Sequence, residues 1–199
     1  MAVNTVGVTQ QTAERMLLDA GAIYKNLQYD DVSGEFTGEA LGATSGGNEF
    51  TVEIEQRQPE LDGVKSRIKG LSFVNTHEAQ WVVNLKELTA ENVRRAIGPA
   101  DVNTSDTNFD IITGRSYIEE GDFLENIAYV GRLSGSQKPV VILLKNALSA
   151  EGFTMTSEDD NEAVIPITFY AYADFEDAQA GKVAYEIYWP KSEGNGAGE

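Results

Sequence analysis

Few residues of this chain could carry out chemistry. The sequence contains no cysteine and only one histidine, His77, in the segment VNTHEAQW. A catalytic triad would place a nucleophile and a carboxylate beside that histidine, and no G-x-S-x-G segment marks a nucleophile. We therefore interpret His77 as a surface or turn residue near the end of a strand.

The glycine-rich stretch LGATSGGNEFTVEIE (41–55) could in principle hold a phosphate group. A P-loop needs a Lys and a Ser or Thr after its second glycine, and it must open a helix. Here Asn48 follows the glycine pair, and the next lysine is Lys65. Apolar and polar residues then alternate over 50–55, which is typical of a half-buried strand. The sequence thus disfavours a nucleotide site and leaves the glycines to be explained otherwise.

The acidic residues also fail to define a site. The segment SEDDNEA (157–163) could attract calcium, but it lacks the spacing of an EF-hand loop, and we interpret it as a hairpin turn. The 32 acidic residues offer many carboxylate pairs for glycoside hydrolysis, with none singled out. We predict that the chain is not an enzyme and uses no cofactor or metal. A carbohydrate- or calcium-binding β-sandwich module and a hydrolase with an unmarked carboxylate pair remain alternatives.

Composition narrows the possible partners. The chain has 199 residues, 41% of them hydrophobic, which is enough for one sizeable core. Its net charge of −17 excludes nucleic-acid binding by neutralisation of phosphates. No apolar run approaches the roughly 20 residues that span a bilayer, and no basic-then-apolar segment resembles a secretory signal. We therefore expect no membrane partner. We expect synthesis in the cytoplasm, a reducing compartment that suits a chain without cysteine.

Hydrophobic periodicity predicts a mainly β protein. Two amphipathic helices are expected, in TQQTAERMLLDAG (9–21) and LTAENVRRAIGP (88–99), the second with Thr89 as its N-cap and Gly98 at its end. Alternating or apolar runs predict strands at 22–29, 49–57, 64–73, 79–85, 109–118, 126–133, 139–148, 152–156, 163–174 and 183–190. This spacing predicts an antiparallel β-sandwich or β-barrel with one or two short helices packed outside.

One segment does not fit this pattern. Residues 30–48 show little strand or helix signal, and a loop of that length in a compact domain is usually functional or disordered. We predict a single β domain over 1–190, from which 30–48 projects as a long loop. The small polar residues of 191–199 predict a flexible tail.

The chain resembles the major tail tube proteins of long-tailed bacteriophages and the related injection-system tubes, in segments spread over most of its length. The resemblance is carried, in order, by DAGAIYKNL (19–27), LGATSGGNEFTVEIE (41–55), ELDGVKSRIKG (60–70), LKELTAENVRRAIG (85–98) and KNALSAEGFTMTSEDDNEAVIPITFYAYAD (145–174). It implies a structural virion protein that forms hexameric rings, which stack into a hollow tube for DNA ejection. The implied partners are other copies of the chain, tape-measure, terminator and distal tail proteins, and genomic DNA that passes without specific binding. A tail terminator or adaptor protein that forms a single ring is the alternative within this class.

The resemblance gives the 30–48 loop a role in assembly. Such an arm would be mobile in the free subunit and ordered on a neighbour, and glycines would permit both states. The residues expected to make inter-subunit contacts are Gly38, Leu41, Gly42, Ala43, Thr44, Gly46 and Gly47.

The negative charge also acquires a role in a tube. Carboxylates that line the bore would repel passing DNA, so that it slides instead of binding. The residues expected to face the bore are Glu53 and Glu55, on the polar face of the first long strand. Lys65, Arg67 and Lys69 lie on the expected partner strand and would neutralise these glutamates if they shared that face.

Overall fold

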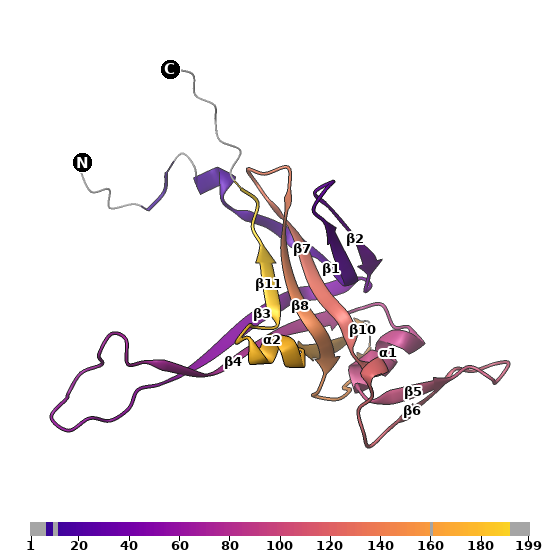
Figure 1. Ribbon diagram of the computed structural model, residues 1–199. Helices are drawn as coiled ribbons and strands as arrows, with labels where there is room; N and C mark the ends of the chain where they lie inside the picture. The colour runs from indigo at the N-terminus through magenta and orange to yellow at the C-terminus, as the bar shows by residue number, and fades with distance from the viewer. Residues whose placement is uncertain (1–6, 10–11, 160, 192–199) are drawn as a thin grey trace.

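Antiparallel strands form most of the molecule, as the sequence predicts. The computed structural model describes residues 7–9, 12–159 and 161–191 (Figure 1). The strands are β1 (Leu17–Asp30), β2 (Glu35–Ala40), β3 (Thr44–Arg57), β4 (Phe73–Leu85), β5 (Ala100–Asn103), β6 (Ile111–Gly114), β7 (Leu124–Leu133), β8 (Pro139–Ser149), β9 (Thr156–Glu158), β10 (Asn161–Tyr170) and β11 (Tyr185–Tyr188). The helices are α1 (Ala90–Ile97) and α2 (Phe175–Gln179), with single 3-10 turns at η1 (Thr12–Glu14) and η2 (Glu120–Asp122).

The main sheet folds over on itself to make two layers. Its strand order is β2-β1-β7-β8-β10-β4-β3, with β11 paired to β8 and β9 to β10. β8 and β10 share only two residue pairs, Phe169 with Ser149 and Tyr170 with Leu148. Because this junction is so short, the strands on either side of it separate into two facing layers. The result is the sandwich or barrel-like β fold expected from the sequence. A separate ribbon of β5 and β6 extends from one end.

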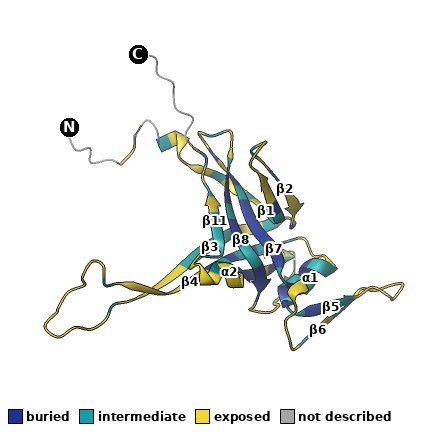
Figure 2. Cartoon of the chain, in the orientation of Figure 1, coloured by how far each residue is buried: buried dark blue, intermediate teal, exposed yellow. Residues whose placement is uncertain are grey.

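The core lies between the two layers. Alternate residues of each strand point inward, among them Ile127 of β7, Leu144 of β8, Val83 of β4 and Ile167 of β10, all buried (Figure 2). Helix α1 adds Ala96 to the same cluster.

Helix α1 forms where the sequence predicts it, for the expected reasons. The Thr89 side-chain oxygen accepts a hydrogen bond from the Asn92 backbone N–H at 3.1 Å, which caps the first turn. Gly98 ends the helix with φ +86, and a Cβ there would lie 2.5 Å from the carbonyl oxygen of Ser149. Only glycine fits this position.

The expected helix over 9–21 is wrong. Within the described residues of this segment only the short turn η1 is helical, and β1 begins at Leu17, which pairs with Leu133 of β7. Gly21 is not a helix cap, because it lies at an irregularity of β1 where a Cβ would come within 2.2 Å of the Tyr129 ring. Pairing with β7 overrides the helical periodicity, since helix propensity is a weak prior.

The expected strand over 64–73 is also wrong. Residues 58–72 form a loop, and only Phe73 of this segment belongs to a strand, the first residue of β4. Gly63 and Gly70 have positive φ angles in turns of this loop. Its alternating apolar residues have no sheet to cover, so their pattern does not lead to strand pairing.

The prediction of a long loop over 30–48 is wrong as well. β1 turns at residues 31–34 into β2, and residues 41–43 link β2 to β3, so the rest of 30–48 is strand. The expected strand over 109–118 shortens to β6, and α2 gave no sequence signal. Apart from Lys191, the predicted flexible tail lies outside the described residues.

The two-layer core predicts that the same substitution, Leu→Ala, changes the free energy of unfolding very differently at two positions. Leu144→Ala, at a side chain with no exposed surface, should lower the free energy of unfolding by about 2–5 kcal/mol, because it leaves a cavity. Leu61→Ala, in the loop at 49% exposure, should change it by no more than ~0.5 kcal/mol. Denaturant titration of both variants measures the difference. Equal losses would contradict this placement of the core.

Candidate functional site: a projecting arm and an acidic sheet face

A two-stranded arm projects from the body of the molecule. We define the arm as residues 54–76, which comprise the outer ends of β3 and β4 and the loop 58–72 between them (Figure 1). β10 pairs with β4 only from Leu85 to Gln80, whereas β3 and β4 remain paired out to Arg57 and Phe73. The arm therefore runs on beyond the sheet as a ribbon without further strands.

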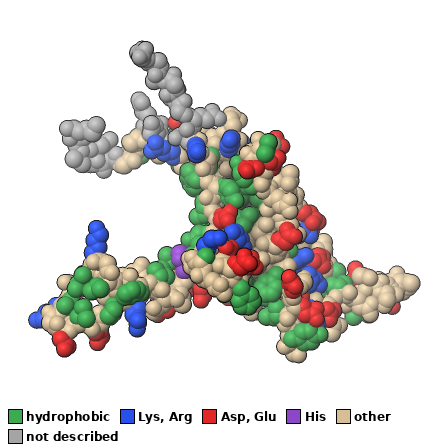
Figure 3. Space-filling model, viewed as in Figure 1, with side chains coloured by type: hydrophobic (Ala, Val, Ile, Leu, Met, Phe, Trp, Pro, Cys, Tyr) green, Lys and Arg blue, Asp and Glu red, His purple; other side chains and the backbone are tan. Residues whose placement is uncertain are grey.

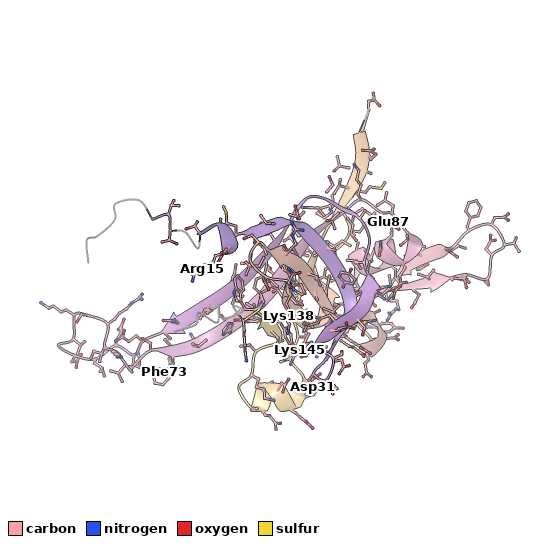
Figure 4. All side chains as sticks on the ribbon, turned by 90° about the horizontal axis from the view of Figure 1, so that it is seen from above. Arg15, Asp31, Phe73, Glu87, Lys138 and Lys145 are labelled. Carbon is pink, nitrogen blue, oxygen red and sulfur yellow. The ribbon has the colours of Figure 1, made fainter. Side chains whose placement is uncertain are left out.

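The arm exposes large apolar side chains along its length. Phe73 and Val74 are 54% and 57% exposed, and Ile54, Leu61 and Val64 are also exposed. Hydrophobic atoms gather on the arm in the space-filling view, with basic side chains around them (Figure 3). From above, Phe73 lies out on the arm, well away from Glu87 (Figure 4). Contiguous exposed apolar surface of this kind marks an interaction site, and an isolated ribbon is only marginally stable by itself.

His77 lies at the root of the arm. Its Nε2 atom lies 3.1 Å from the hydroxyl of Tyr185, and Tyr185 packs edge-on against Phe50. The interpretation of His77 as a surface or turn residue is wrong, because it is half-buried within β4 and contacts β11. These contacts join the arm to the body.

The outer face of β3, β4 and β10 is acidic. Glu53 pairs across the strands with Glu78, and Glu55 pairs with Thr76. The expected placement of Lys65, Arg67 and Lys69 on a partner strand is wrong, because they lie in the loop 58–72. The condition for neutralising Glu53 and Glu55 across the strands is therefore not met. Glu53, Glu78, Glu151 and Tyr170 line a shallow hollow of about 240 Å³ on this face, with no basic side chain among its lining residues.

Hydrogen bonds fix one carboxylate of this face. The hydroxyl groups of Tyr170 and Thr168 donate to the two oxygens of Glu151, at 2.7 and 2.8 Å. The bond from Tyr170, followed by that from Thr168, lowers the pKa of the Glu151 carboxyl. The same bond to Glu151 raises the pKa of Tyr170 to about 12, with smaller contributions from burial and nearby carboxylates. At neutral pH the charged carboxylate of Glu151 therefore lies beside the neutral phenol of Tyr170.

Several residues expected in an assembly loop instead hold the body together. Gly38 lies in β2, where a Cβ would come 2.8 Å from the Leu27 side chain. Leu41 is 5% exposed and belongs to the core, and its backbone N–H donates to the Ile23 carbonyl at 2.9 Å. The Ala43 backbone N–H donates to Glu87 Oε2 at 3.2 Å.

The glycines of the 41–55 stretch form an irregular start to β3. The pairing of β3 with β4 shifts between Thr44 and Asn48, and both Gly46 and Gly47 adopt φ +87. The Asn84 side-chain amide donates to the Gly47 carbonyl at 2.8 Å across this bulge. Gly42, in the link before it, has φ +141. These glycines meet backbone requirements of the strand, and an inter-subunit role for them stays a prediction.

An ion-pair network without a sequence signal anchors the β5–β6 ribbon. Asp122, with 1% of its side chain exposed, accepts hydrogen bonds from Arg115 at 2.6 Å and Arg94 at 3.4 Å. Asp122 also accepts a bond from the Glu119 backbone N–H at 2.8 Å, so the buried charge is fully paired. Because these residues come from α1, the segment after β6 and η2, only the tertiary structure brings them together.

Among the described residues, no group of three or more His, Asp or Glu side chains could hold a metal ion. The acidic segment 157–163 lies partly outside the described residues. Within the described part of the chain, no helix has the length and apolar character needed to cross a membrane. No protein-family model and no curated protein matches this chain.

The bond between Glu151 and Tyr170 predicts a pH-dependent stability difference. Glu151→Gln should lower the free energy of unfolding at pH 7 by at most about 1 kcal/mol, because water screens this exposed carboxylate. A lowered carboxyl pKa stabilises the fold above its unfolded value of 4.5, and that contribution is lost as the pH falls through the folded value. Variant and parent should therefore converge under acid conditions in thermal melts. A difference in stability between variant and parent that persists at acid pH would assign the effect to packing.

Proposed function

We propose that this chain is the subunit of a bacteriophage tail tube, assembled as stacked hexameric rings around a channel for DNA. The observation that carries the proposal is the arm, a ribbon whose apolar side chains are exposed and not covered by any other described part of the chain. Such a surface suits contact with another copy. The sixfold ring and the tube come from the resemblance of the sequence to tail tube proteins.

Unpaired strand edges give the subunit a means of lateral growth. β2 and β3 stand at the two ends of the main strand order, and each has a strand partner on one side only among the described residues. Exposed edges of this kind invite pairing with another chain. Pairing between unlike edges of neighbouring copies is heterologous, and it gives a closed ring when the rotation closes.

The acidic sheet face suits the inner wall of the tube. Glu53 and Glu78 lie side by side on it, with no basic partner among the described residues, and Glu151 adds a third carboxylate. Facing the bore, these charges would repel DNA phosphates and leave no counterion release to favour binding. Glu55 lies farther out, within the arm, so in this arrangement it would meet a neighbouring ring.

In this role the protein would belong to the tail of the virion after assembly in the bacterial cytoplasm. Tape-measure protein would lie within the tube, and terminator and distal tail proteins would bind its two ends. These partners follow from the proposed function and from the resemblance alone.

Electron microscopy of the purified chain over a concentration series tests the proposal. We expect hollow filaments of uniform width with sixfold end views. Replacing 58–72 by an Asn-Gly turn should abolish the filaments while leaving the circular dichroism of the body unchanged, since that turn closes a two-residue hairpin. Single rings that never stack would favour the terminator or adaptor protein. A strict monomer that binds calcium or a sugar saturably would overturn the proposal in favour of a ligand-binding module.

The acidic wall predicts that wild-type filaments do not retain DNA. The double substitution Glu53→Lys with Glu78→Lys should make filaments that co-sediment with DNA at low salt and release it at high salt, because lysine–phosphate contacts release counterions. The matched control, Asp31→Lys with Asp110→Lys, makes the same charge change at two exposed positions outside the strands and the acidic face, and should leave DNA in the supernatant. DNA retention by the control alone would mean that the acidic face of β3, β4 and β10 does not line the bore.

A further inference from the structure

The tip of the arm has the opposite charge to the rest of the molecule. Residues 57–72 carry four basic and two acidic side chains, in a chain whose net charge is −17. Within the described residues, none of the four cations forms an ion pair with a carboxylate, whereas most cations of the body do. The four are Arg57, Lys65, Arg67 and Lys69. Their charge is therefore free to meet a complementary surface.

Apolar side chains accompany these cations. Leu61, Val64 and Ile68 are exposed in the loop. Hydrogen bonds from Val64 N–H to the Leu61 carbonyl, at 3.1 Å, and from Leu71 N–H to the Ile68 carbonyl, at 3.2 Å, turn the backbone. The tip thus presents a turned, apolar surface with a basic surround.

The body carries a hollow that could receive such a tip, because it has an apolar lining and acidic residues. It lies between η2, the start of β7, the end of β8 and α2, with a volume of about 720 Å³, large enough to hold several side chains. Its lining includes Ile118, Tyr172 and Phe175, of which Phe175 is 90% exposed. We call it the acidic hollow, because its charged lining residues are Glu119, Glu120, Glu125 and Asp174 and no basic side chain lines it.

The acidic hollow is held open by its own contacts. Asn146, with φ +45, donates from its side-chain amide to the Tyr172 carbonyl at 3.1 Å and to Asp174 Oδ1 at 2.9 Å. The Tyr172 ring packs edge-on against Phe123 at 5.2 Å between centroids. Of its carboxylates, Glu119 is paired with Arg115, while Glu120 and Glu125 have no ion-pair partner among the described residues.

Charge distinguishes this hollow from two other depressions. The one between β1 and β7, of about 540 Å³, is lined by Arg132 and Lys138 and by a single acidic residue, Asp19. An aromatic groove of about 440 Å³ is lined by Tyr29, Phe36, Tyr188 and Trp189 together with Lys138 and Lys191. Its only charged lining residues are basic, so it would repel the arm tip. The acidic hollow would attract the same tip, and long-range charge complementarity selects among these surfaces.

We propose that the arm tip of one copy docks into the acidic hollow of a second copy, with Leu61, Val64 and Ile68 on the apolar lining and the basic residues facing Glu120 and Glu125. The arm leads away from the body of its own chain (Figure 1), so the occupant is a neighbour. The contact joins two different surfaces and therefore propagates from copy to copy. This inference rests on the proposed self-assembly and names the surface that receives the arm.

Charge reversal on each side, and then on both, tests the contact in the full-length chain. Glu120→Lys with Glu125→Lys reverses the hollow, and Lys65→Glu with Lys69→Glu reverses the arm tip. Each pair alone should weaken self-association about tenfold or more in light scattering and sedimentation, because like charges would then face each other. The chain that carries all four substitutions should regain association to within about threefold of the parent, since the complementarity is restored in reverse.

The controls separate this contact from general charge effects and from misfolding. Asp31→Lys with Asp110→Lys makes the same charge change as in the hollow, at two exposed positions outside the strands, and should leave association unchanged. All variants alter exposed side chains, so their thermal melts should match the parent within error.

The remaining outcomes distinguish the two proposals. Normal association of the hollow variant, or failure of the four-substitution chain to recover, would overturn docking in the acidic hollow while filament formation by the parent upheld the tube. A parent chain that stays monomeric at every concentration would overturn both proposals.

Discussion

The early end of β10 determines the architecture of this molecule. β10 pairs with β4 only as far as Gln80 and reaches β8 through just two residue pairs. The short junction with β8 folds one continuous sheet into two layers and so creates the core. Beyond that point β3 is the only strand that pairs with β4 among the described residues, and the two strands leave the body together. The same strand ending thus produces both a stable body and an arm that extends from it.

The side chains of β3 and β4 also differ between the body and the arm. Near the body, the inward residues of β3 and β4 join an aromatic cluster in which Phe50 contacts Trp81 at 5.2 Å between centroids. On the outward side the same stretch carries Glu53 and Glu78. Farther out there is no second layer, so apolar residues such as Phe73 and Val74 are exposed on the arm. A monomer gains nothing from this exposure, whereas an assembling subunit can bury it against a neighbour.

Opposite charges on arm and body would let association combine attraction with burial. Long-range attraction orients two copies, and burial of apolar side chains then holds them together. The acidic outer face of β3, β4 and β10 takes no part in that contact and remains available to face a channel. In the proposed tube, separate surfaces would therefore serve assembly and DNA passage.

The sequence by itself determined the mainly β class, helix α1 with its caps, and the alternation that puts Glu53 on the polar face of its strand. These features depend on local periodicity and capping, which neighbouring residues specify. Only the tertiary structure decided that β1 begins at Leu17 in place of a helix, that 64–72 is loop, and that 30–48 is a hairpin and link. In each case the deciding factor was the presence or absence of a pairing strand distant in sequence, such as β7 for Leu17. The acidic hollow and the Arg115–Asp122 pair were beyond sequence reasoning for the same reason, because their residues meet only after the strands have paired.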